Sequence, residues 1–478
     1  MDTYTTRIDG ENDVWDSNVD MGYHYSEGVA LYELTITLTD ANGGFTVEPN
    51  YLESHDPCTN TYTYTNFAGH TFTLTAMPDA NYYVEAWYDV NGAVASIDRV
   101  FEVVMDSNHA YILEFKPRST VHVTGGGSAL KDAVADAGNG DIIYVEKGYT
   151  YEGGIDLEGK EITIVSSHPD DIPSVESTVI DCEGSGRAFT FDSGEGPGTV
   201  IHGFTIINGS LETQSGGAIY IGAGCSPTLA HLIIRDCNTG SGRGGAIYIG
   251  PDAEPNLCNI TISNCTAGNN GGAIYVSANS SPLLKNCNIA NCSVSMGYGG
   301  GIYYGHDCNA VLEGCTFTGN SADYGGAIYF HINCVSQLTD CTFSDNSSDY
   351  GGAIYNYFNC VSELTGCVFT GNISNRDGGA VDCDANNVVT VAGCDFRSNL
   401  ADHGGALYLG LNCSGTITDT TLVENDANED GGGIYFTDSN IAVSDCNISY
   451  NTAAHGAGLY CLRSPESSIV DIAFIRAA

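Results

Sequence analysis

The sequence predicts an all-β protein whose larger part is a repetitive solenoid of stacked strands. A five-residue word, GGAIY with small variations, begins ten times between Gly216 and Gly456, at steps of 25 to 28 residues. Steps this even and of this length suit one turn of a stacked-strand solenoid. The 60 glycines, together with many Thr, Asn, Ser and Tyr, favour strands joined by tight turns over helices.

The region before the repeats contains two kinds of predicted structure. Residues 29–118 alternate apolar and polar residues in short runs such as Leu34 to Leu38, without the repeat period, and predict a separate small all-β domain. Further along, Ser128 is a candidate N-cap for a short helix with Leu130 and Val134 on one face. Such a helix can cover the open end of the first coil and shield its strand edges.

Residues 119–478 predict about 12 coils of three strands each. Counted from the first Gly of each word, an apolar residue stands 13 positions later in nine repeats and 12 positions later at Val443. A second column, three positions further on, is rich in Cys, and a third, two beyond that, is Ile, Leu or Phe. About 26 residues suit three strands and three turns, so successive coils lie about 4.8 Å apart and each column forms a ladder along the axis.

Cysteine and asparagine occupy fixed columns of this pattern. One Cys column runs from Cys287 to Cys446. We expect its thiols to pack as small hydrophobic groups, and disulfides or metal binding are the alternatives. A second column, between Cys225 and Cys413, comes within disulfide reach of its neighbours in stacked coils. An Asn column between Asn320 and Asn451 predicts a turn ladder whose side-chain amides bond to the coils above and below.

Alternation along the strand assigns the two faces of the GGAIY word. The Ile of each word faces the core, so the following Tyr faces outward and forms an aromatic stripe, which its small neighbours leave accessible. Either the rings stack and hold the coils together, or they offer a platform for a glycan or a partner protein. The candidate glycan- or partner-binding residues of the stripe are Tyr303, Tyr329, Tyr355, Tyr408 and Tyr435.

One coil interrupts the tyrosine stripe. In the seventh repeat the word becomes GGAVDCD, which places Asp382 between Tyr355 and Tyr408. A second carboxylate follows two positions later, beside two ring side chains of the preceding coils. Such a group suits acid/base catalysis or cation binding, and sequence drift at one surface coil is the alternative. If the chain is an enzyme, its candidate catalytic residues are Asp382, Asp384, His331 and Tyr357.

A carboxylate also recurs in the turn before the GG pair. Carboxylates repeated about 5 Å apart repel one another, so either solvent screens them or a hard cation bridges them. We expect weak calcium binding along this edge and no other required cofactor. The candidate metal ligands are Asp323, Asp349, Asp377, Asp402 and Asp430.

The charge balance excludes several classes of partner. Fifteen Lys plus Arg against 59 Asp plus Glu give a formal net charge of −44, which repels nucleic acid and anionic membranes or polymers. Cations or neutral polymers are favoured instead. The sequence contains no apolar run long enough to span a membrane, and residues 1–28 carry no secretion signal. The missing signal fits a cytosolic protein, or a mature or excised piece of an exported one.

Two stretches resemble known families. Residues 43–117, with GGFTVEPN and FTLTAMPDANYYVEAWYDVNG, resemble the Listeria and Bacteroides type of bacterial surface repeat. From Val121 onward, STVIDCEGSG, HGFTIING and the GGAIY series resemble the right-handed parallel β-helix family. That family includes pectate lyases and polygalacturonases, autotransporter passengers, chlamydial-type polymorphic membrane proteins and large bacterial surface proteins. The resemblance implies a right-handed, single-stranded parallel β-helix over 119–478.

The two ends of the chain suggest a larger array. The segment VDMGYHY, Val19 to Tyr25, resembles the tail that closes such units in large surface proteins, so residues 1–28 are expected to be the tail of a preceding β-helix unit or a linker. At the other end, the residues from Ser468 begin another coil without a polar cap. We therefore expect a longer parent protein or end-to-end self-association.

The fold alone does not choose between an enzyme and a scaffold. Enzymes of the family that this chain resembles use calcium-binding Asp clusters with a basic residue, or paired Asp residues near NTD and RIK-like motifs, and none of these words occurs in this sequence. We expect an extracellular or cell-surface structural or adhesive protein without catalytic activity, a rigid spacer roughly 60 Å long. A polysaccharide-binding or polysaccharide-degrading β-helix module is the alternative.

Overall fold

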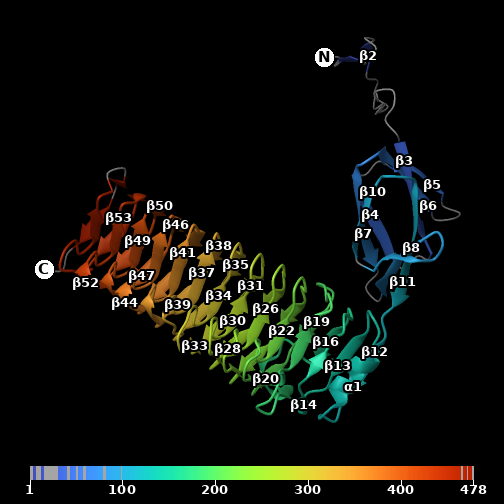
Figure 1. Ribbon diagram of the computed structural model, residues 1–478, viewed down its shortest axis with the longest axis horizontal. Helices are drawn as coiled ribbons and strands as arrows, with labels where there is room; N and C mark the ends of the chain where they lie inside the picture. Colours follow the sequence, from blue (N-terminus) through green and yellow to red (C-terminus); the bar gives the residue numbers. More distant parts are fainter. Residues whose placement is uncertain are drawn as a thin grey trace. The chain divides into compact units, whose positions relative to one another are not determined.

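The structure is a computed structural model that describes residues 4–6, 12–14, 31–39, 43–49, 52–56, 61–78, 82–97, 99–464, 467–470 and 472–475. The chain divides into two compact units, Met1–Ser119 and Thr120–Ala478 (Figure 1). The segment Val19 to Tyr25, which resembles the tail of a preceding unit, lies outside the described residues.

The first unit is a small all-β body with two main sheets, in the orders β10–β7–β4 and β5–β6–β3–β11–β8–β9. Inward side chains of both sheets, among them Phe72, Trp87 and Leu113, form one fully buried core. Its relation to the bacterial surface repeats stays a prediction. The strands are β1 (Tyr4–Thr6), β2 (Asn12–Val14), β3 (Leu31–Leu38), β4 (Gly43–Glu48), β5 (Leu52–Asp56), β6 (Thr61–Phe67), β7 (Thr71–Pro78), β8 (Tyr82–Asp89), β9 (Val94–Ser96), β10 (Val100–Val104) and β11 (His109–Pro117).

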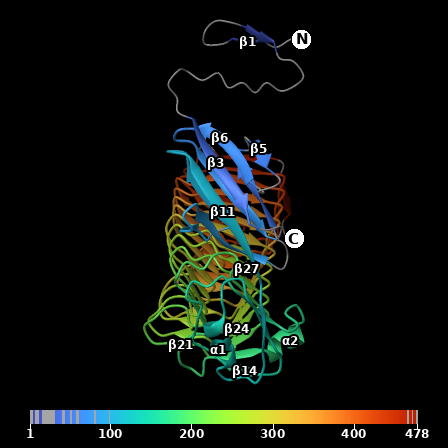
Figure 2. The ribbon, with the colours of Figure 1, turned by 90° about the vertical axis from the view of Figure 1, so that its right-hand side faces the viewer.

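The second unit is a parallel β-solenoid, as predicted, built from three long sheets of 14, 13 and 12 strands (Figures 1 and 2). We call the first the leucine sheet, after the inward column that includes Leu229. It consists of β12 (Thr120–Val123), β13 (Ile142–Val145), β16 (Thr163–Ser166), β19 (Val200–His202), β23 (Thr228–Ala230), β27 (Asn256–Cys258), β31 (Leu283–Lys285), β35 (Asn309–Glu313), β38 (Val335–Thr339), β42 (Val361–Thr365), β46 (Val388–Ala392), β50 (Ser414–Thr418), β54 (Asn440–Ser444) and β57 (Ser468–Val470).

The second sheet follows the leucine sheet in each coil, and we call it the phenylalanine sheet after its inward column, which includes Phe317. It consists of β14 (Thr150–Glu152), β17 (Val179–Asp181), β20 (Thr205–Ile207), β24 (Ile233–Arg235), β28 (Thr261–Ser263), β32 (Asn288–Ala290), β36 (Thr316–Thr318), β39 (Thr342–Ser344), β43 (Val368–Thr370), β47 (Asp395–Arg397), β51 (Thr421–Val423), β55 (Asn447–Ser449) and β58 (Ala473–Ile475).

The third sheet carries the GGAIY words, and we call it the tyrosine sheet. It consists of β15 (Ile155–Asp156), β18 (Phe189–Phe191), β22 (Ile219–Ile221), β26 (Ile247–Ile249), β30 (Ile274–Val276), β34 (Ile302–Tyr304), β37 (Ile328–Ile332), β41 (Ile354–Phe358), β45 (Val381–Ala385), β49 (Leu407–Leu411), β53 (Ile434–Thr437) and β56 (Leu459–Leu462).

Short strands also form in the turn that leads from the phenylalanine sheet to the tyrosine sheet. They make two four-stranded sheets, which the three-strand prediction did not include. The first contains β21 (Ser210–Leu211), β25 (Asn238–Thr239), β29 (Thr266–Ala267) and β33 (Ser293–Val294), and the second contains β40 (Ser347–Tyr350), β44 (Ile373–Asp377), β48 (Leu400–His403) and β52 (Asp426–Asp430).

The register of the sheets confirms the predicted ladders. Leu229 pairs with Leu257 and so on along the column, and Val443, one position early in the sequence, still pairs with Ile417 before it and Ile469 after it. In the phenylalanine column, the rings from Phe317 to Phe396 stack with centroids 4.6 to 4.9 Å apart. Each coil therefore repeats its neighbour residue for residue through the core.

The asparagine column forms the predicted ladder in the turn after the phenylalanine sheet. Nδ2 of Asn346 donates to the backbone oxygen of Phe317 in the preceding coil at 3.0 Å and to Oδ1 of Asn372 in the next coil at 3.0 Å. The same pattern runs from Asn320 to Asn425, and all of these side chains are fully buried. The ladder therefore satisfies backbone groups that the sharp turn leaves without strand partners.

The 18 cysteines among the described residues are free thiols, and 16 of them are buried. Those of the first Cys column point into the core and donate to backbone oxygens of the preceding coil, as Cys367 Sγ does to Leu338 O at 3.4 Å. Those of the second column do the same, with Cys334 Sγ 2.9 Å from Gly305 O. The thiols therefore pack as small hydrophobic groups, and the disulfides considered for the second column are not formed.

We expect thiol titration to follow this burial. Cys461 is exposed, whereas burial raises the pKa of Cys413 to about 12 and suppresses its reactive thiolate. In the absence of reductant, Ellman's reagent should react quickly with Cys461 and slowly with the buried thiols, and after unfolding in guanidinium it should detect at least the 18 described thiols. A lower count after unfolding would show that disulfides link the coils.

A short helix lies at the N-terminal end of the solenoid, where the first coil would otherwise be open (Figures 1 and 2). Helix α1 (Ala129–Asp136) buries Leu130 and Val134 in the solenoid core, as predicted. Ser128 is its N-cap residue, but the hydroxyl bonds to Asp132 and not to a backbone N–H. Helix α2 (Ile172–Ser177) lies in an insertion of the second coil and was not predicted.

Candidate functional site

The outward surface of the tyrosine sheet carries a ladder of stacked rings. Neighbouring rings from Tyr220 to Tyr355 lie 5.0 to 5.4 Å apart and within 12° of parallel. The ladder breaks at Asp382 and resumes from Tyr408 to Tyr460. Strand alternation produces this arrangement, because the inward Ile of each word forces the next side chain to the opposite face.

The rings of this stripe are less accessible than predicted, which agrees with the stacking alternative, and binding of a glycan or partner by them stays a prediction. Tyr303, Tyr329 and Tyr355 are only 4 to 7% exposed and Tyr435 is 8% exposed, while Tyr408 is half-buried. Stacked rings cover one another's faces, so mainly ring edges can meet a ligand. The central members of the ladder therefore form a small aromatic core outside the main one, and they hold the coils together.

A second ladder lies beside the first and helps to cover it. It contains the residue before the first Gly of each of the last seven words, in the order Tyr298, Tyr324, Tyr350, Asp377, His403, Asp430 and His455. Its rings reach over the tyrosine ladder, with centroid distances of 4.8 Å from Tyr298 to Tyr329 and 5.2 Å from Tyr324 to Tyr355. The turn residues before the first Gly of each word therefore contribute to the same outward surface as the tyrosine ladder.

This register corrects the predicted column of five calcium ligands. Asp377 and Asp430 belong to the second ladder, whereas Asp323, Asp349 and Asp402 stand one position earlier, two residues before the GG pair. The turns differ in length by one residue, so the strand register places the carboxylates in two columns. Asp349 and Asp402 accept hydrogen bonds from Asn375 and Asn428 of the next coil, both at 2.8 Å. Calcium binding at this edge stays a prediction.

Where the tyrosine ladder breaks, all three outward positions of one coil are aspartates. Asp377, Asp382 and Asp384 stand in register with Tyr350, Tyr355 and Tyr357 of the preceding coil. We call these three residues the aspartate row. Sequence reasoning found two members and assigned Asp377 to the calcium edge. Counting backward from the GG pair, instead of forward from the Asn column, would have found the third.

The carboxyl groups of the aspartate row all have raised pKa values. Burial is the first cause in each case. For Asp382 the charges of the two neighbouring carboxylates add to the effect of burial, and its pKa lies well above its usual range. For Asp384 a hydrogen bond from the Tyr355 hydroxyl at 3.1 Å partly opposes the effect of burial on the pKa. Burial outweighs the attraction of His403 at Asp377. Asp382 is 2% exposed, and its Oδ1 has no hydrogen-bond partner among the described residues.

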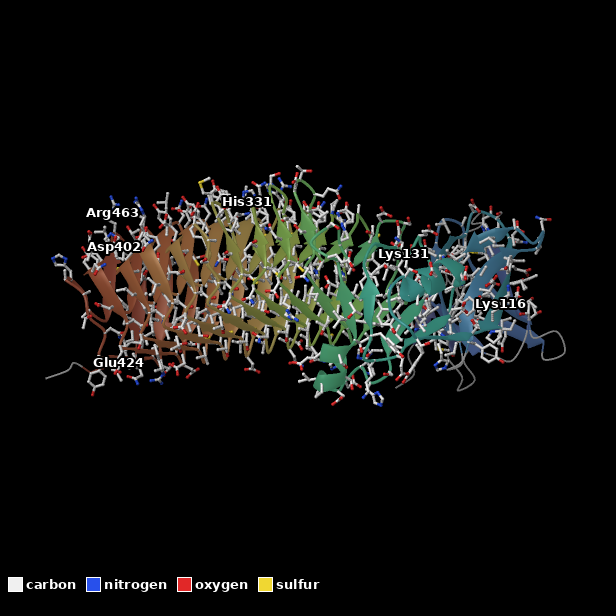
Figure 3. The ribbon with its side chains drawn as sticks, turned by 90° about the horizontal axis from the view of Figure 1, so that it is seen from below. Lys116, Lys131, His331, Asp402, Glu424 and Arg463 are labelled. Carbon is white, nitrogen blue, oxygen red and sulfur yellow. The ribbon has the colours of Figure 1, made fainter. Side chains whose placement is uncertain are left out.

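A pocket of about 460 Å³ opens next to the aspartate row, and we call it the aromatic pocket. It is lined by Tyr298, Tyr324, Tyr329, His331, Tyr350, Tyr355, Tyr357 and Asp384. His331 stacks on Tyr357 at 5.5 Å and 9°, and burial together with the nearby His306 lowers its pKa, so the imidazole is neutral at pH 7. Figure 3 shows His331 and Asp402 along the same edge of the solenoid, opposite Glu424.

Three of the four candidate catalytic residues thus meet in one pocket. His331, Tyr357 and Asp384 line the aromatic pocket, whereas Asp382 lies buried beside it and does not. The arrangement can bind a polar ligand with a flat apolar face through ring edges, one carboxyl group and one imidazole.

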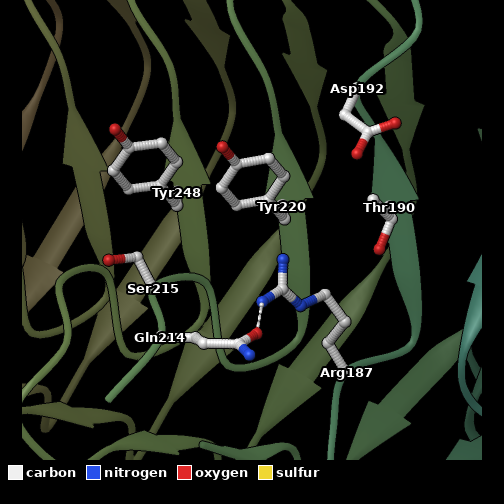
Figure 4. A pocket seen from close by; sticks show the side chains of 7 residues that line it. All are labelled: Arg187, Thr190, Asp192, Gln214, Ser215, Tyr220 and Tyr248. Atoms are coloured by element: carbon white, nitrogen blue, oxygen red, sulfur yellow. Dashed lines mark hydrogen bonds between the residues drawn. The ribbon is translucent and has the colours of Figure 1, made fainter.

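A second pocket, which sequence reasoning missed, lies at the N-terminal end of the tyrosine ladder (Figure 4). It has a volume of about 560 Å³. The Arg187 guanidinium lies 4.8 Å from the centre of the Tyr220 ring and donates to Gln214 Oε1 at 2.9 Å. Burial lowers the pKa of Arg187. The cation covers the outer ring face of the ladder, so the stack offers no free face here.

Comparison with known families agrees with this architecture. The family model described as a right-handed beta helix region matches residues 177–369. The chain is a right-handed parallel β-helix repeat protein. In this β-helix protein a second model, the Chlamydia polymorphic membrane protein repeat, matches residues 366–384 and includes the whole aspartate row. That match suggests a surface-exposed protein. No helix among the described residues of the β-helix protein is long and apolar enough to cross a membrane.

The other comparisons add little about the site. Among solved structures, the β-helix protein is similar to a Family 28 exopolygalacturonase of Yersinia enterocolitica, with 9% identity over 89% of this chain and 87% of that chain. The TM-score of 0.25 is too low to carry an argument. No curated protein matches the chain.

Proposed function

We propose that this β-helix protein is a surface-exposed adhesive protein that binds a neutral glycan in the aromatic pocket and does not cleave it. The observation that carries this proposal is the lining of the pocket, in which six tyrosines accompany one carboxyl group and one imidazole. A volume of about 460 Å³ falls within the range of small-ligand sites, which are mostly aromatic with a few fixed polar groups.

The rigidity of the pocket supports binding. Five of its six tyrosines belong to the two ladders, whose rings pack on one another, and the sixth, Tyr357, stacks on His331. Little side-chain freedom therefore remains to be lost when a ligand binds. The exposed parts are Tyr357, which is 38% exposed, and Tyr298, which is 39% exposed. These two rings flank the pocket and offer the accessible aromatic surface that the buried ladder does not.

The charge of the protein supports a neutral ligand. The net charge of −44 and the nearby aspartate row oppose an anionic polyuronate, whereas a neutral sugar chain meets no such repulsion. Asp384 accepts from the Tyr355 hydroxyl through one oxygen, which leaves acceptor capacity for ligand hydroxyl groups.

Loss of a pocket side chain should weaken glycan binding. We expect Tyr357→Ala, which removes an exposed ring, and Asp384→Asn, which removes an acceptor but keeps the shape, each to weaken binding by about tenfold, or ~1.4 kcal/mol. Affinity electrophoresis against a panel of neutral and acidic polysaccharides, followed by calorimetric titration of those that bind, measures the change.

Tyr450→Ala is the matched control, because Tyr450 is an exposed ring that does not line the aromatic pocket. It should bind as the unchanged protein does. Equal affinity of Tyr357→Ala and the unchanged protein for every polysaccharide that binds would contradict the proposal, and so would preferential binding of polyuronates.

A second candidate function is glycoside hydrolysis, and the aspartate row is the observation that favours it. Asp382 and Asp384 stand two residues apart on one strand, roughly 6.6 Å between Cα atoms, a spacing within reach of the carboxyl pairs of inverting enzymes. Their raised pKa values suit a general acid. However, Asp382 is nearly inaccessible. Release of reducing ends that Asp382→Asn abolishes would favour this function over adhesion.

A further inference from the structure

Two histidines and an aspartate converge on the outside of the early coils, far along the chain from the aromatic pocket. His202 ends β19, His231 follows β23 in the next coil, and Asp170 lies in the insertion before α2. Nε2 of His202 lies 3.0 Å from Oδ1 of Asp170 and 2.8 Å from Nδ1 of His231. The third side of the triangle, from His231 Nδ1 to Asp170 Oδ1, is 3.3 Å.

These distances match the spacing of ligand atoms around one metal ion. Zinc bonds to imidazole nitrogen and carboxylate oxygen at about 2.0 to 2.2 Å in tetrahedral geometry, which places neighbouring ligand atoms roughly 3.3 Å apart. Among the described residues, these three form the one group of at least three His, Cys, Asp or Glu side chains whose ligand atoms converge in this way. The two rings are stacked, with centroids 4.9 Å apart.

The backbone at His231 places the imidazole at a turn position that the later coils fill with Asn, Asp or Gly. His231 has φ +48°, in the left-handed region, at the turn between the leucine and phenylalanine sheets. The same turn position in later coils holds residues that adopt this conformation readily: Asn259, Asn286, Gly314, Asp340, Gly366, Gly393, Asp419 and Asp445. The left-handed backbone of His231 costs some conformational free energy, and it holds the imidazole beside the next coil.

The surroundings hold the imidazoles in place for binding. Nδ2 of Asn259 donates to Nε2 of His231 at 3.1 Å, and Oδ1 of Asn259 accepts from Nδ2 of Asn286 at 3.2 Å. Binding of a metal through Nδ1 of His231 places the ring proton on Nε2 and therefore turns the Asn259 amide over. Asp170 is 72% exposed, which leaves room for a water molecule as the fourth ligand.

We propose that Asp170, His202 and His231 form a binding site for a divalent transition-metal ion, with zinc the best fit to the ligand types and their spacing. The ion joins the α2 insertion to two successive coils, so it acts as a clamp at the N-terminal end of the β-helix. The site is independent of glycan binding, because none of its residues lines the aromatic pocket.

Calorimetric titration of the metal-stripped full chain with zinc chloride tests the site, and cobalt substitution reports its ligands. We expect one ion per chain, a raised thermal midpoint, and visible cobalt absorption without the intense near-ultraviolet band of thiolate ligands. The most informative variant is His231→Asn, because Asn occupies this turn position in the next two coils and should fold normally. It should weaken zinc binding at least a hundredfold.

Asp170→Asn, in an exposed loop, gives a second variant with the same expected direction. His168→Ala is the matched control in the same insertion, because the His168 ring contacts Ser167 and not the three ligands, and it should bind zinc unchanged. The proposal is overturned if the unchanged protein takes up no zinc, if His231→Asn binds as tightly as the unchanged protein, or if the cobalt complex shows thiolate ligands.

Discussion

Asn372→Ala should lower the free energy of unfolding by about 3 to 5 kcal/mol, because it breaks the buried asparagine ladder at its middle. Nδ2 of Asn372 donates to Phe343 O at 3.0 Å and to Asn399 Oδ1 at 2.9 Å. Its Oδ1 accepts from the backbone and side-chain nitrogens of Asn346. The substitution therefore leaves groups of two neighbouring coils unsatisfied where solvent does not reach.

Urea unfolding of the full chain, followed by circular dichroism, measures this loss as a lower midpoint. The matched control is Asn375→Ala in the same turn, since Asn375 is exposed and its amide bonds only the Asp349 carboxylate at 2.8 Å. That change should cost less than about 1 kcal/mol. Similar midpoints for the two variants would mean that the ladder contributes no more than a surface hydrogen bond.

The inward columns could be predicted from the sequence because each coil repeats the same side chain at the same depth. A period of about 26 residues fixes which residues share a ladder, and Val443 joined its column although the sequence spacing was one short. The turn between Asn372 and Gly378 could not be predicted in this way. It varies in length, and the strand register, set by backbone hydrogen bonds, decides which turn residues align.

The candidate site was predictable only in part, for the same reason. Three successive strands of the tyrosine sheet carry His331, Tyr357 and Asp384 on the same face. Each stands at the same offset from its GG pair, so their proximity follows from the period of the repeat. The burial of Tyr355 does not follow from it, because the covering ring of Tyr324 comes from the variable turn. The group of Asp170, His202 and His231 depends on a single insertion, which a periodic pattern cannot reveal.

Asp382→Asn should make the protein more stable at pH 7 and remove much of the pH dependence of its stability. Burial, then the charges of Asp377 and Asp384, raise the pKa of Asp382 well above its usual range. The usual value, about 3.9, applies to the unfolded chain. Between these two values the folded state binds more protons than the unfolded state, so stability is greatest near pH 4 and falls as pH rises toward the folded pKa.

The size of this effect follows from the shift. Each pH unit in that window costs about 1.4 kcal/mol, so the gain in stability from Asp382→Asn at pH 7 grows with the size of the shift. Asp377 and Asp384 are shifted in the same direction, so a smaller slope should remain in the variant. Urea midpoints measured from pH 4.5 to 7.5 should therefore fall steeply for the unchanged protein and gently for Asp382→Asn.

Asp345→Asn provides the matched control for charge. It removes one negative charge from an exposed turn residue with φ +54°, a conformation that Asn adopts equally well. Any gain that comes only from lowering the net charge of −44 should appear in both variants. If Asp345→Asn flattens the pH profile as much as Asp382→Asn does, the instability at neutral pH arises from overall repulsion and not from the buried carboxyl group that interrupts the tyrosine ladder.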